Sequence, residues 1–288
     1  MSSSTPFRDE QGSPSPGRRR GPRPSIALVP VRRADGSVAE EHVVVEEPLE
    51  VRLGTRSLLI TMRTPGADLD LVRGMLFTEG LLARAEDLGA LQHCADVPPE
   101  AAGNVVTVSL VPGASLVEEH AVRVGLVTSA CGVCGKATLA AIGGSAPTVR
   151  PGPALRAELV LSLPAGLSAG QALFARTGGL HAAALFAADG RRLALAEDVG
   201  RHNAVDKVVG EALRFRRVPL HDTLLMVSGR TGFEIVQKAR RAGIPVIASV
   251  SAPSSLAIDL ARDGGQTLIG FVRERAFNVY CGAERFSL

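Results

Sequence analysis

Residues 223–272 read TLLMVSGRTGFEIVQKARRAGIPVIASVSAPSSLAIDLARDGGQTLIGFV, and this stretch decides the fold. Short runs rich in Leu, Val and Ile alternate in it with longer amphipathic segments, which predicts buried strands that alternate with helices. The strands are expected at 223–227, 246–250 and 267–272, and the helices at 231–242 and 254–263. Connections of this kind are right-handed crossovers, so we expect a largely parallel or mixed sheet with helices on both faces.

The sequence before this stretch extends the same domain and then changes character. A helix is expected at 203–215, and two runs that flank Asp189-Gly190 predict a hairpin. The first half has β-type runs and one helical period, which is typical of an α+β arrangement. Its strands are expected at 26–31, 42–51, 57–62, 105–111 and 121–127, its helix at 68–83, and the hairpin strands at 181–186 and 192–197. We therefore expect a smaller N-terminal α+β domain over 25–127 and an α/β domain over 128–288.

Residues 1–24 are rich in Ser, Pro, Gly and Arg and offer almost nothing to bury, so we expect a disordered basic tail. This tail holds five of the 32 basic and two of the 29 acidic residues, which accounts for the whole net charge of +3. The remaining chain is balanced in charge. The composition therefore gives no support for nucleic-acid binding.

No apolar run approaches the roughly 20 residues that span a bilayer, so we expect no membrane segment and a cytoplasmic protein. Four cysteines in 288 residues do not resemble a disulfide framework. Free thiols in a reducing compartment are the expectation.

The strongest chemical signal is the pair Cys131 and Cys134 in the segment SACGVCGK, residues 129–136. A thiolate is a strong nucleophile near neutral pH, and a second thiol close by can lower its pKa, form a disulfide with it, or share a metal. The spacing leaves four interpretations open: half of a structural zinc site, a thioredoxin-type redox pair, a persulfide carrier, and two cysteines without a joint function.

The residues around the pair, and the other possible metal ligands in the chain, help to compare these interpretations. A structural zinc ion needs four ligands, and no second CxxC or HxxxH pair is present, so Cys94 with His93, or Cys281, would have to complete the site. Gly132 and Gly135 frame the pair and favour a mobile loop, as a sulfur carrier needs if it is to reach both a donor and an acceptor. We expect no resident metal.

Three segments place small or polar residues where a strand gives way to a helix: Glu197–Asn203, Ser228–Gly232 and Ser251–Ser255. In an open α/β sheet such loops gather at the carboxyl ends of the strands, where helix N-termini bind anions. Ordinary capping of the helices by Asn203, Thr231 or Ser254 is the alternative. The candidate ligand-binding residues are His181, Arg201, His202, Asn203, Ser228, Arg230 and Ser254.

These segments together resemble the formate dehydrogenase accessory sulfurtransferase family, FdhD. The resemblance runs from about residue 40 to the C-terminus. It rests on the segments 128–136, 176–181, 197–207, 227–230, 251–255 and 277–280. It implies a cytoplasmic sulfurtransferase that accepts sulfur from a cysteine desulfurase as a cysteine persulfide. The sulfur then goes to the molybdenum cofactor with two guanine dinucleotide arms, bis-molybdopterin guanine dinucleotide, that formate dehydrogenase requires.

The resemblance also implies residue roles, a fold and an assembly. Cys131 would carry the persulfide and Cys134 would assist it, while the cofactor would be bound only transiently. The C-terminal segment matches the place where the family is taken to bind the cofactor; it comprises Phe277, Asn278, Val279, Tyr280, Cys281 and Gly282. The resemblance implies no particular cysteine at 281. The implied fold is that of cytidine deaminases, and the implied assembly is a homodimer.

Other classes of protein remain to be weighed. A zinc deaminase needs a His-x-Glu motif followed by Pro-Cys-x-x-Cys, but Ala183 lies two residues after His181, Ala130 precedes the cysteine pair, and the cysteines come first in the chain. A non-catalytic chaperone for the molybdenum cofactor and a dithiol redox protein remain as alternatives to the sulfurtransferase.

Overall fold

The computed structural model describes residues 23–117, 126–127, 148–215 and 217–286. The cysteine pair and nearly all of the expected basic tail lie outside the described residues. Arg23, which we assigned to the tail, is held against the body of the protein: its guanidinium donates to Glu47 Oε1 at 2.8 Å and to the carbonyl of Ala102 at 2.8 Å.

The larger of the two main sheets has six strands in the order β13-β12-β11-β10-β8-β9. Strands β10, β11 and β12 are parallel, and the other pairs are antiparallel. The predicted mixed sheet is confirmed, including the β8–β9 hairpin. The strands span His181–Ala187 (β8), Arg192–Asp198 (β9), Thr223–Val227 (β10), Val246–Ser249 (β11), Thr267–Gly270 (β12) and Asn278–Cys281 (β13). We did not predict β13, because four residues of mixed character carry no clear period.

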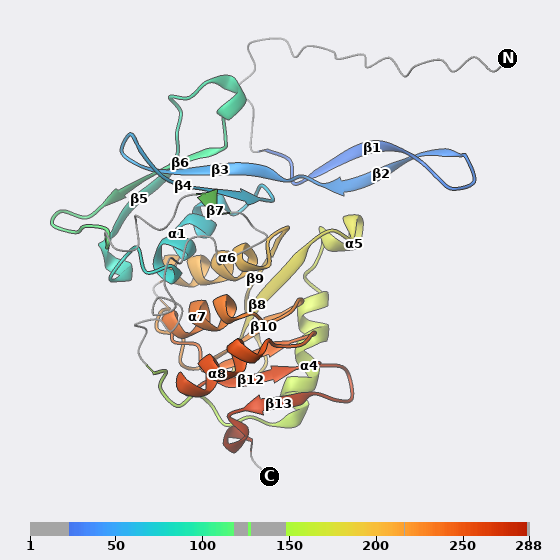
Figure 1. Cartoon of the computed structure of the whole chain (residues 1–288), viewed down its shortest axis with the longest axis vertical. Helices are drawn as coiled ribbons and strands as arrows, with labels where there is room; N and C mark the ends of the chain where they lie inside the picture. Colours follow the sequence, from blue (N-terminus) through green and yellow to red (C-terminus); the bar gives the residue numbers. More distant parts are fainter. Residues whose placement is uncertain (1–22, 118–125, 128–147, 216, 287–288) are drawn as a thin grey trace.

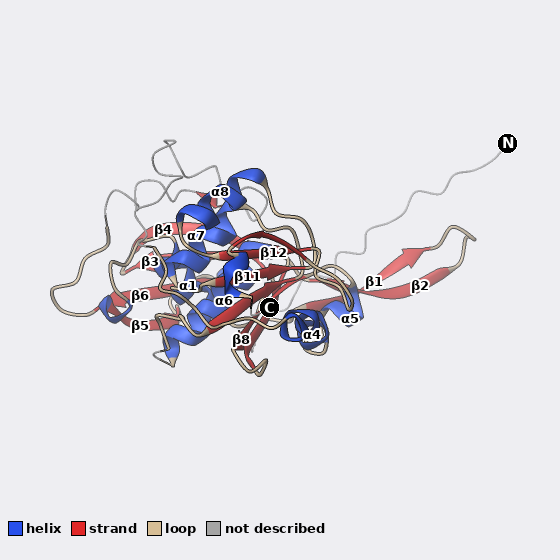
Figure 2. Ribbon diagram, turned by 90° about the horizontal axis from the view of Figure 1, so that it is seen from below, coloured by secondary structure: helices blue, strands red, loops and turns tan. Residues whose placement is uncertain are grey.

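Helices cover both faces of this sheet (Figures 1 and 2), as the alternation of elements predicted. On β10, Leu225 and Val227 join the core with α6, α7 and α8, whereas Leu224 and Met226 join the core with α4. Burial on both faces explains why the central strands are rich in apolar residues at consecutive positions. The helices span Ala157–Ser168 (α4), Phe174–Thr177 (α5), Arg201–Arg214 (α6), Phe233–Arg241 (α7) and Ser255–Asp263 (α8). We did not predict α4, which contains Pro164.

The first half forms a five-stranded sheet in the order β5-β6-β3-β4-β7, with α1 packed against it. Its elements are β3 (Glu47–Leu53), β4 (Arg56–Arg63), α1 (Asp68–Thr78), β5 (Leu88–His93), β6 (Val105–Leu110) and β7 (Leu126–Val127), with short 3-10 turns at Ala85–Asp87 and Pro99–Ala101. The predicted helix over 68–83 is too long, because Gly80 turns the chain with φ 75° and Leu81 and Leu82 enter the core beyond it.

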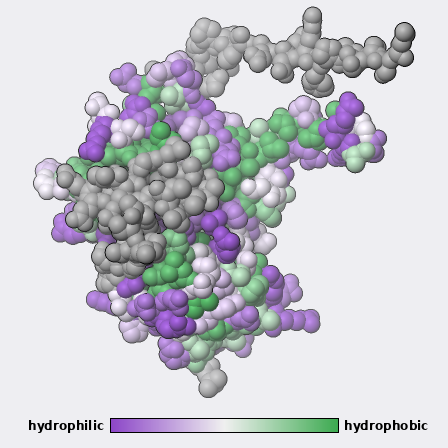
Figure 3. All heavy atoms as spheres, viewed as in Figure 1, coloured by the Kyte–Doolittle hydropathy of each residue, from purple (hydrophilic) through white to green (hydrophobic). Residues whose placement is uncertain are grey.

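The predicted strand over 42–51 is in fact two strands with different partners. β2 (Val38–Val44) pairs with β1 (Ile26–Arg32) in a separate ribbon, whereas β3 pairs with β4. The ribbon projects from the body, with apolar side chains along its length and hydrophilic ones at its tip (Figures 1 and 3). Val38 is 69% exposed there.

The two sheets are joined by α1 and α6, which cross with their backbones nearly in contact. A Cβ at Gly74 would lie 1.9 Å from the carbonyl oxygen of Asp206, and one at Gly210 would lie 1.8 Å from that of Asp70. Only glycine at both positions permits this approach. Among the described residues, none of the helices combines the length and the apolar character needed to cross a membrane.

Candidate functional site

The three strand-end segments meet at one edge of the six-stranded sheet. β8 runs antiparallel to β10, so its first residue, His181, lies beyond the carboxyl end of β10 and pairs with Asp198. The parallel strands β10 and β11 end at the same edge, and α6, α7 and α8 begin there. The structure therefore brings together His181, Arg201, His202, Ser228, Arg230 and Ser254.

His181 is half-buried against the loop after β10. A Cβ at Gly229 would lie 3.1 Å from His181 Nδ1, so this glycine makes room for the imidazole. Burial lowers the pKa of His181, the nearby positive charge of Arg201 lowers it further, and Asp198 opposes both effects. The imidazole is therefore neutral near pH 7 and able to accept a proton. Ser228 fixes the loop, because its Oγ accepts a hydrogen bond from the amide of Ala182 at 2.9 Å.

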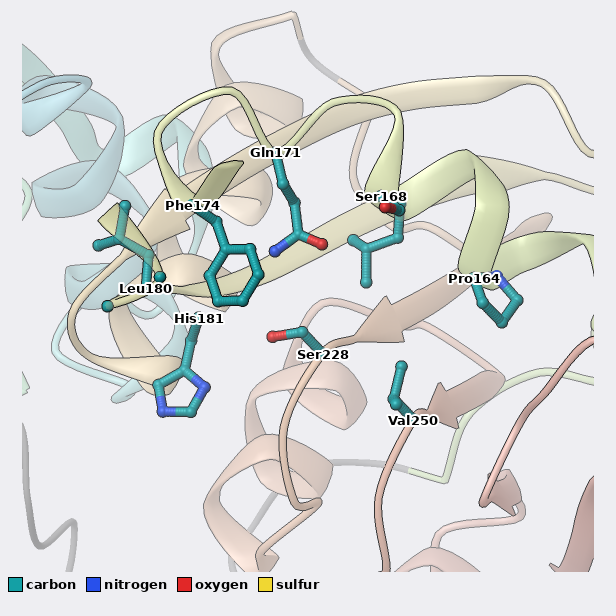
Figure 4. A pocket seen from close by; sticks show the side chains of 11 residues that line it. Pro164, Ser168, Gln171, Phe174, Leu180, His181, Ser228 and Val250 are labelled. Atoms are coloured by element: carbon teal, nitrogen blue, oxygen red, sulfur yellow. The ribbon is translucent and has the colours of Figure 1, made fainter. Parts of the chain in front are cut away.

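A pocket of about 650 Å³ opens beside His181 and Ser228 (Figure 4). Its other walls come from the end of α4, the α5 turn and Val250, and Phe174 and Gln171 border it opposite Ser228. The lining is mostly apolar with a few polar groups, which is typical of a site for a small organic ligand. The sequence indicated His181 and Ser228 here and predicted a helix end at 171–176, but it gave no signal that the end of α4 would form a wall of the same pocket.

The start of α6 combines basic side chains with the N-terminus of a helix. Its N-cap is Gly200, which provides no side-chain cap. The Nε atom of Arg201 is buried and has no hydrogen-bond partner among the described residues. Such a corner, with a guanidinium beside a helix N-terminus, favours an anionic group.

Asn203 is used differently from its neighbours. Its side chain is 3% exposed, and its Nδ2 donates to Asp198 Oδ1 at 2.9 Å and to the carbonyl of Met62 at 2.8 Å. Asp198 also forms an ion pair with Lys207 at 2.7 Å. These contacts tie the loop before α6 to the end of β4, so the Asn203 amide positions this loop.

Helix capping explains one of the three segments. Ser254 caps α8, because its Oγ accepts from the amide of Ala257 at 3.3 Å. Thr231 does not cap α7, because the N-cap residue of this helix is Gly232, which provides no side-chain cap. Its Oγ1 is fully buried and has no hydrogen-bond partner among the described residues. Arg230 is exposed at the same edge.

Sequence reasoning missed Glu234 in the first turn of α7. Its Oε2 lies 3.8 Å from Nε2 of His202 in the first turn of α6, and both side chains are about nine-tenths buried. A carboxylate and an imidazole that pair across two helix starts lie far apart in the sequence. The one local signal was a Glu two residues after the Thr231–Gly232 turn, which is also an ordinary position for an acidic residue in a helix.

The C-terminal segment lies at the opposite edge strand, four strand spacings of about 4.8 Å, or about 19 Å, from β8. Asn278 pairs with Gly270 at the carboxyl end of β12, whereas Cys281 and Gly282 lie near Leu268 and Thr267, towards its other end. The other members of the segment sit close by: Phe277 stacks on Phe286, Val279 pairs with Ile269, and the Tyr280 ring lies beside Gly270.

The two described cysteines are not the pair to which we assigned the sulfur chemistry. Cys281 Sγ lies 3.3 Å from the carbonyl oxygen of Gln266, to which it donates, and burial raises the pKa of this thiol. Cys94 is a free thiol in the first half of the chain. Cys131 and Cys134 lie outside the described residues. Within the described parts of the chain, no cluster of three or more His, Cys, Asp or Glu side chains could hold a metal ion.

These features define a mixed α/β protein with a basic, histidine-containing edge and an adjoining pocket at the carboxyl ends of its parallel strands. The model of the FdhD/NarQ family matches residues 44–287, and the chain belongs to that family. A protein of Nocardia farcinica named sulfur carrier protein FdhD is 50% identical over 252 residues, which is 85% of this chain and 88% of that protein.

Two further relatives extend the comparison. A protein with the same name from Anaeromyxobacter sp. is 49% identical over 280 residues, which cover 94% of this chain and 97% of the relative. A crystal structure of a formate dehydrogenase accessory protein from Desulfotalea psychrophila superposes with a TM-score of 0.70 at 27% identity, covering 91% of this chain and 98% of that one. The α/β fold that the sequence predicted is thereby confirmed.

Proposed function

We propose that this protein is a sulfur carrier that takes sulfur from a cysteine desulfurase and delivers it to the molybdenum cofactor of formate dehydrogenase. Membership of the FdhD/NarQ family and relatives named sulfur carriers support the sulfur chemistry. The observation that carries the choice of cargo is the buried, unpartnered Arg201 Nε beside the uncapped start of α6. This corner suits the phosphate groups of the guanine dinucleotide arms.

The proposed acceptor step is a balanced thiol exchange. The Cys131 thiolate attacks the outer sulfur of the donor's persulfide, the donor's S–S bond breaks, and the donor leaves as a thiolate. Cys131 then carries a persulfide. Attack of the Cys134 thiolate on Cys131 Sγ releases hydrosulfide for the cofactor and leaves a Cys131–Cys134 disulfide. A dithiol reductant then restores the two thiols.

The described residues would hold the cofactor cargo during this exchange. Arg201, His202 and Arg230 offer positive charge, and His181 with Ser228 borders the pocket, which has room for a planar part of the cargo. In this proposal the edge strand β13 and Phe277 offer a separate contact for the second arm, and the protein works in the cytoplasm as a homodimer.

The deciding experiment incubates the protein with a cysteine desulfurase and cysteine and then measures its intact mass. We expect the mass of one added sulfur atom that is lost on reduction, in the wild type and in Cys94→Ala but not in Cys131→Ala. The Cys131→Ala variant should also fail to restore formate dehydrogenase activity in cells that lack the native protein. Normal activity with Cys131→Ala would exclude the proposal.

Two alternatives give different results in the same samples. A cofactor-binding chaperone would take up no sulfur, and stoichiometric zinc would then point to a structural role for the cysteines. A dithiol redox protein would cycle through a Cys131–Cys134 disulfide with thioredoxin-type substrates and would carry no persulfide.

A further inference from the structure

Helices α6 and α7 face each other with two pairs of opposite charge, one turn apart. Near the ligand-binding edge, His202 on α6 pairs with Glu234 on α7 at 3.8 Å. One turn further along each helix, Asp206 on α6 pairs with Lys238 on α7 at 2.8 Å. Residues four apart lie on one face of a helix, so the two pairs form consecutive rungs between the same helix faces.

The basic side chain lies on α6 in the outer pair and on α7 in the inner pair. Along each helix, therefore, an acidic and a basic side chain are neighbours and attract each other. The inner rung is fixed by two further contacts: Lys238 Nζ binds Glu79 Oε1 at 2.6 Å, and Thr78 Oγ1 donates to Asp206 Oδ1 at 2.6 Å. The outer rung lies where the ligand-binding edge begins.

The position of Glu234 is itself protected by a glycine. A Cβ at Gly232 would lie 2.7 Å from Glu234 Oε2, so any larger residue at the N-cap of α7 would displace the carboxylate. The carboxylate thus occupies the start of α7, where an anionic ligand would otherwise bind. Of the two neighbouring helix starts, the one at α6 is left for the ligand.

We propose that Glu234 is a positioning residue that holds His202 as an imidazolium ion, and that His202 with Arg201 binds an anionic group of the cargo at the start of α6. This inference rests on the proposed function for the identity of the cargo. The charged groups near His202 include Glu234 on α7, Asp206 one turn along α6 and the neighbouring Arg201. The two carboxylates favour the charged imidazole, whereas Arg201 opposes it.

The two histidines of the edge therefore differ in charge near neutral pH. His181 lies next to Arg201 and is neutral, whereas His202 lies next to Glu234 and is charged. Histidines with opposite protonation states can divide the tasks of accepting a proton and binding a negative charge.

The direct test is the NMR titration of the His202 imidazole in the full-length protein, assigned by comparison with His202→Gln. We expect Glu234→Gln to lower the pKa of His202 by about one unit or more. Glu274→Gln removes the same charge from an exposed loop and should leave the titration unchanged. An unaltered His202 pKa in Glu234→Gln would overturn the inference.

The second test uses inorganic pyrophosphate as the probe and measures its affinity by calorimetry between pH 5.5 and pH 8.5. In the wild type we expect affinity to fall about tenfold or more as His202 loses its proton. In Glu234→Gln the midpoint should move to lower pH together with the His202 pKa, and in His202→Gln the pH dependence should disappear. Binding that does not follow the His202 titration would overturn the anion-binding role. Sulfur uptake by Cys131 is read from intact mass, so failure of the proposed function is distinguished from failure of this inference.

Discussion

Replacing Gly74 by Ala should destabilise the protein, although helix propensity alone predicts the opposite. Gly74 lies inside α1, where Ala is preferred over Gly by about 1 kcal/mol. The new Cβ would lie 1.9 Å from the carbonyl oxygen of Asp206 on α6. Even a close C–H···O contact needs about 3.3 Å between the carbon and the oxygen, so the two helices would have to separate by about 1.4 Å.

Such a separation loses packing along the whole crossing of α1 and α6. Overpacking of this kind costs about 3 kcal/mol, which leaves a net loss of about 2 kcal/mol or more after the gain in propensity. The measurement is equilibrium unfolding in urea, followed by circular dichroism. Gly74→Ala as stable as the wild type would refute the reasoning, because it would mean that the helix backbones are not in contact.

A double-mutant cycle and a control variant separate this contact from other effects of glycine. Gly210→Ala separates the same two helices, so Gly74→Ala with Gly210→Ala should cost clearly less than the sum of the two single changes. Gly178 ends α5 with φ 65° and has no atom within 4 Å of an added Cβ. Gly178→Ala should therefore cost only about 1 kcal/mol, from its left-handed backbone.

The buried charges and the edge of the sheet give further predictions. Lys238→Met leaves the Asp206 carboxyl buried without its cation and should cost about 3–5 kcal/mol in urea unfolding; a loss below about 1 kcal/mol would contradict the importance of the pair. Burial raises the pKa of Asp206 to about 6, above its unfolded value of about 3.9, so its contribution to stability is present below about pH 4 and is lost as pH rises to about 6. In Asp206→Asn the free energy of unfolding should no longer decline between these two pH values. An equal decline in the wild type and the variant would argue against Asp206 as its cause. Gly232→Ala should displace the Glu234 carboxylate and lower the pKa of His202 in NMR titrations, with Gly178→Ala as the control that leaves it unchanged. The His181 imidazole should titrate below about 6.5 in the same spectra, and Arg201→Gln should raise its pKa.

Elements with strong periodicity and clear boundaries were predictable from the sequence. The strands and helices of residues 223–272 are found within about two residues of their expected ends, because each strand is buried on both faces and each helix has one apolar face. The elements that we did not predict, or that we merged into one, have a weak local pattern or no boundary in the sequence. The four residues of β13 are too few to show a period, Pro164 interrupts the helical pattern of α4, and the chain between β2 and β3 is extended without a break.

The candidate site shows the same division. His181, Arg201, His202, Ser228 and Arg230 could be singled out from the sequence because polar residues at strand ends stand out against apolar strands. Glu234 was missed because its importance comes from the opposing His202, which lies on another helix. The sequence gave no sign that the Asn203 amide contacts the carbonyl of Met62, 141 residues away in the chain. No local pattern encodes a contact of that kind.

The sequence by itself determined the alternation of strands and helices, the cysteine pair and the family, because each of these is written in the type and spacing of residues near one another in the chain. Only the tertiary structure decided which charges meet. The crossing of α1 and α6 at Gly74 and Gly210, the rungs between α6 and α7, and the pocket beside His181 all depend on the distances between elements. Those distances follow from how the side chains of the whole core pack together.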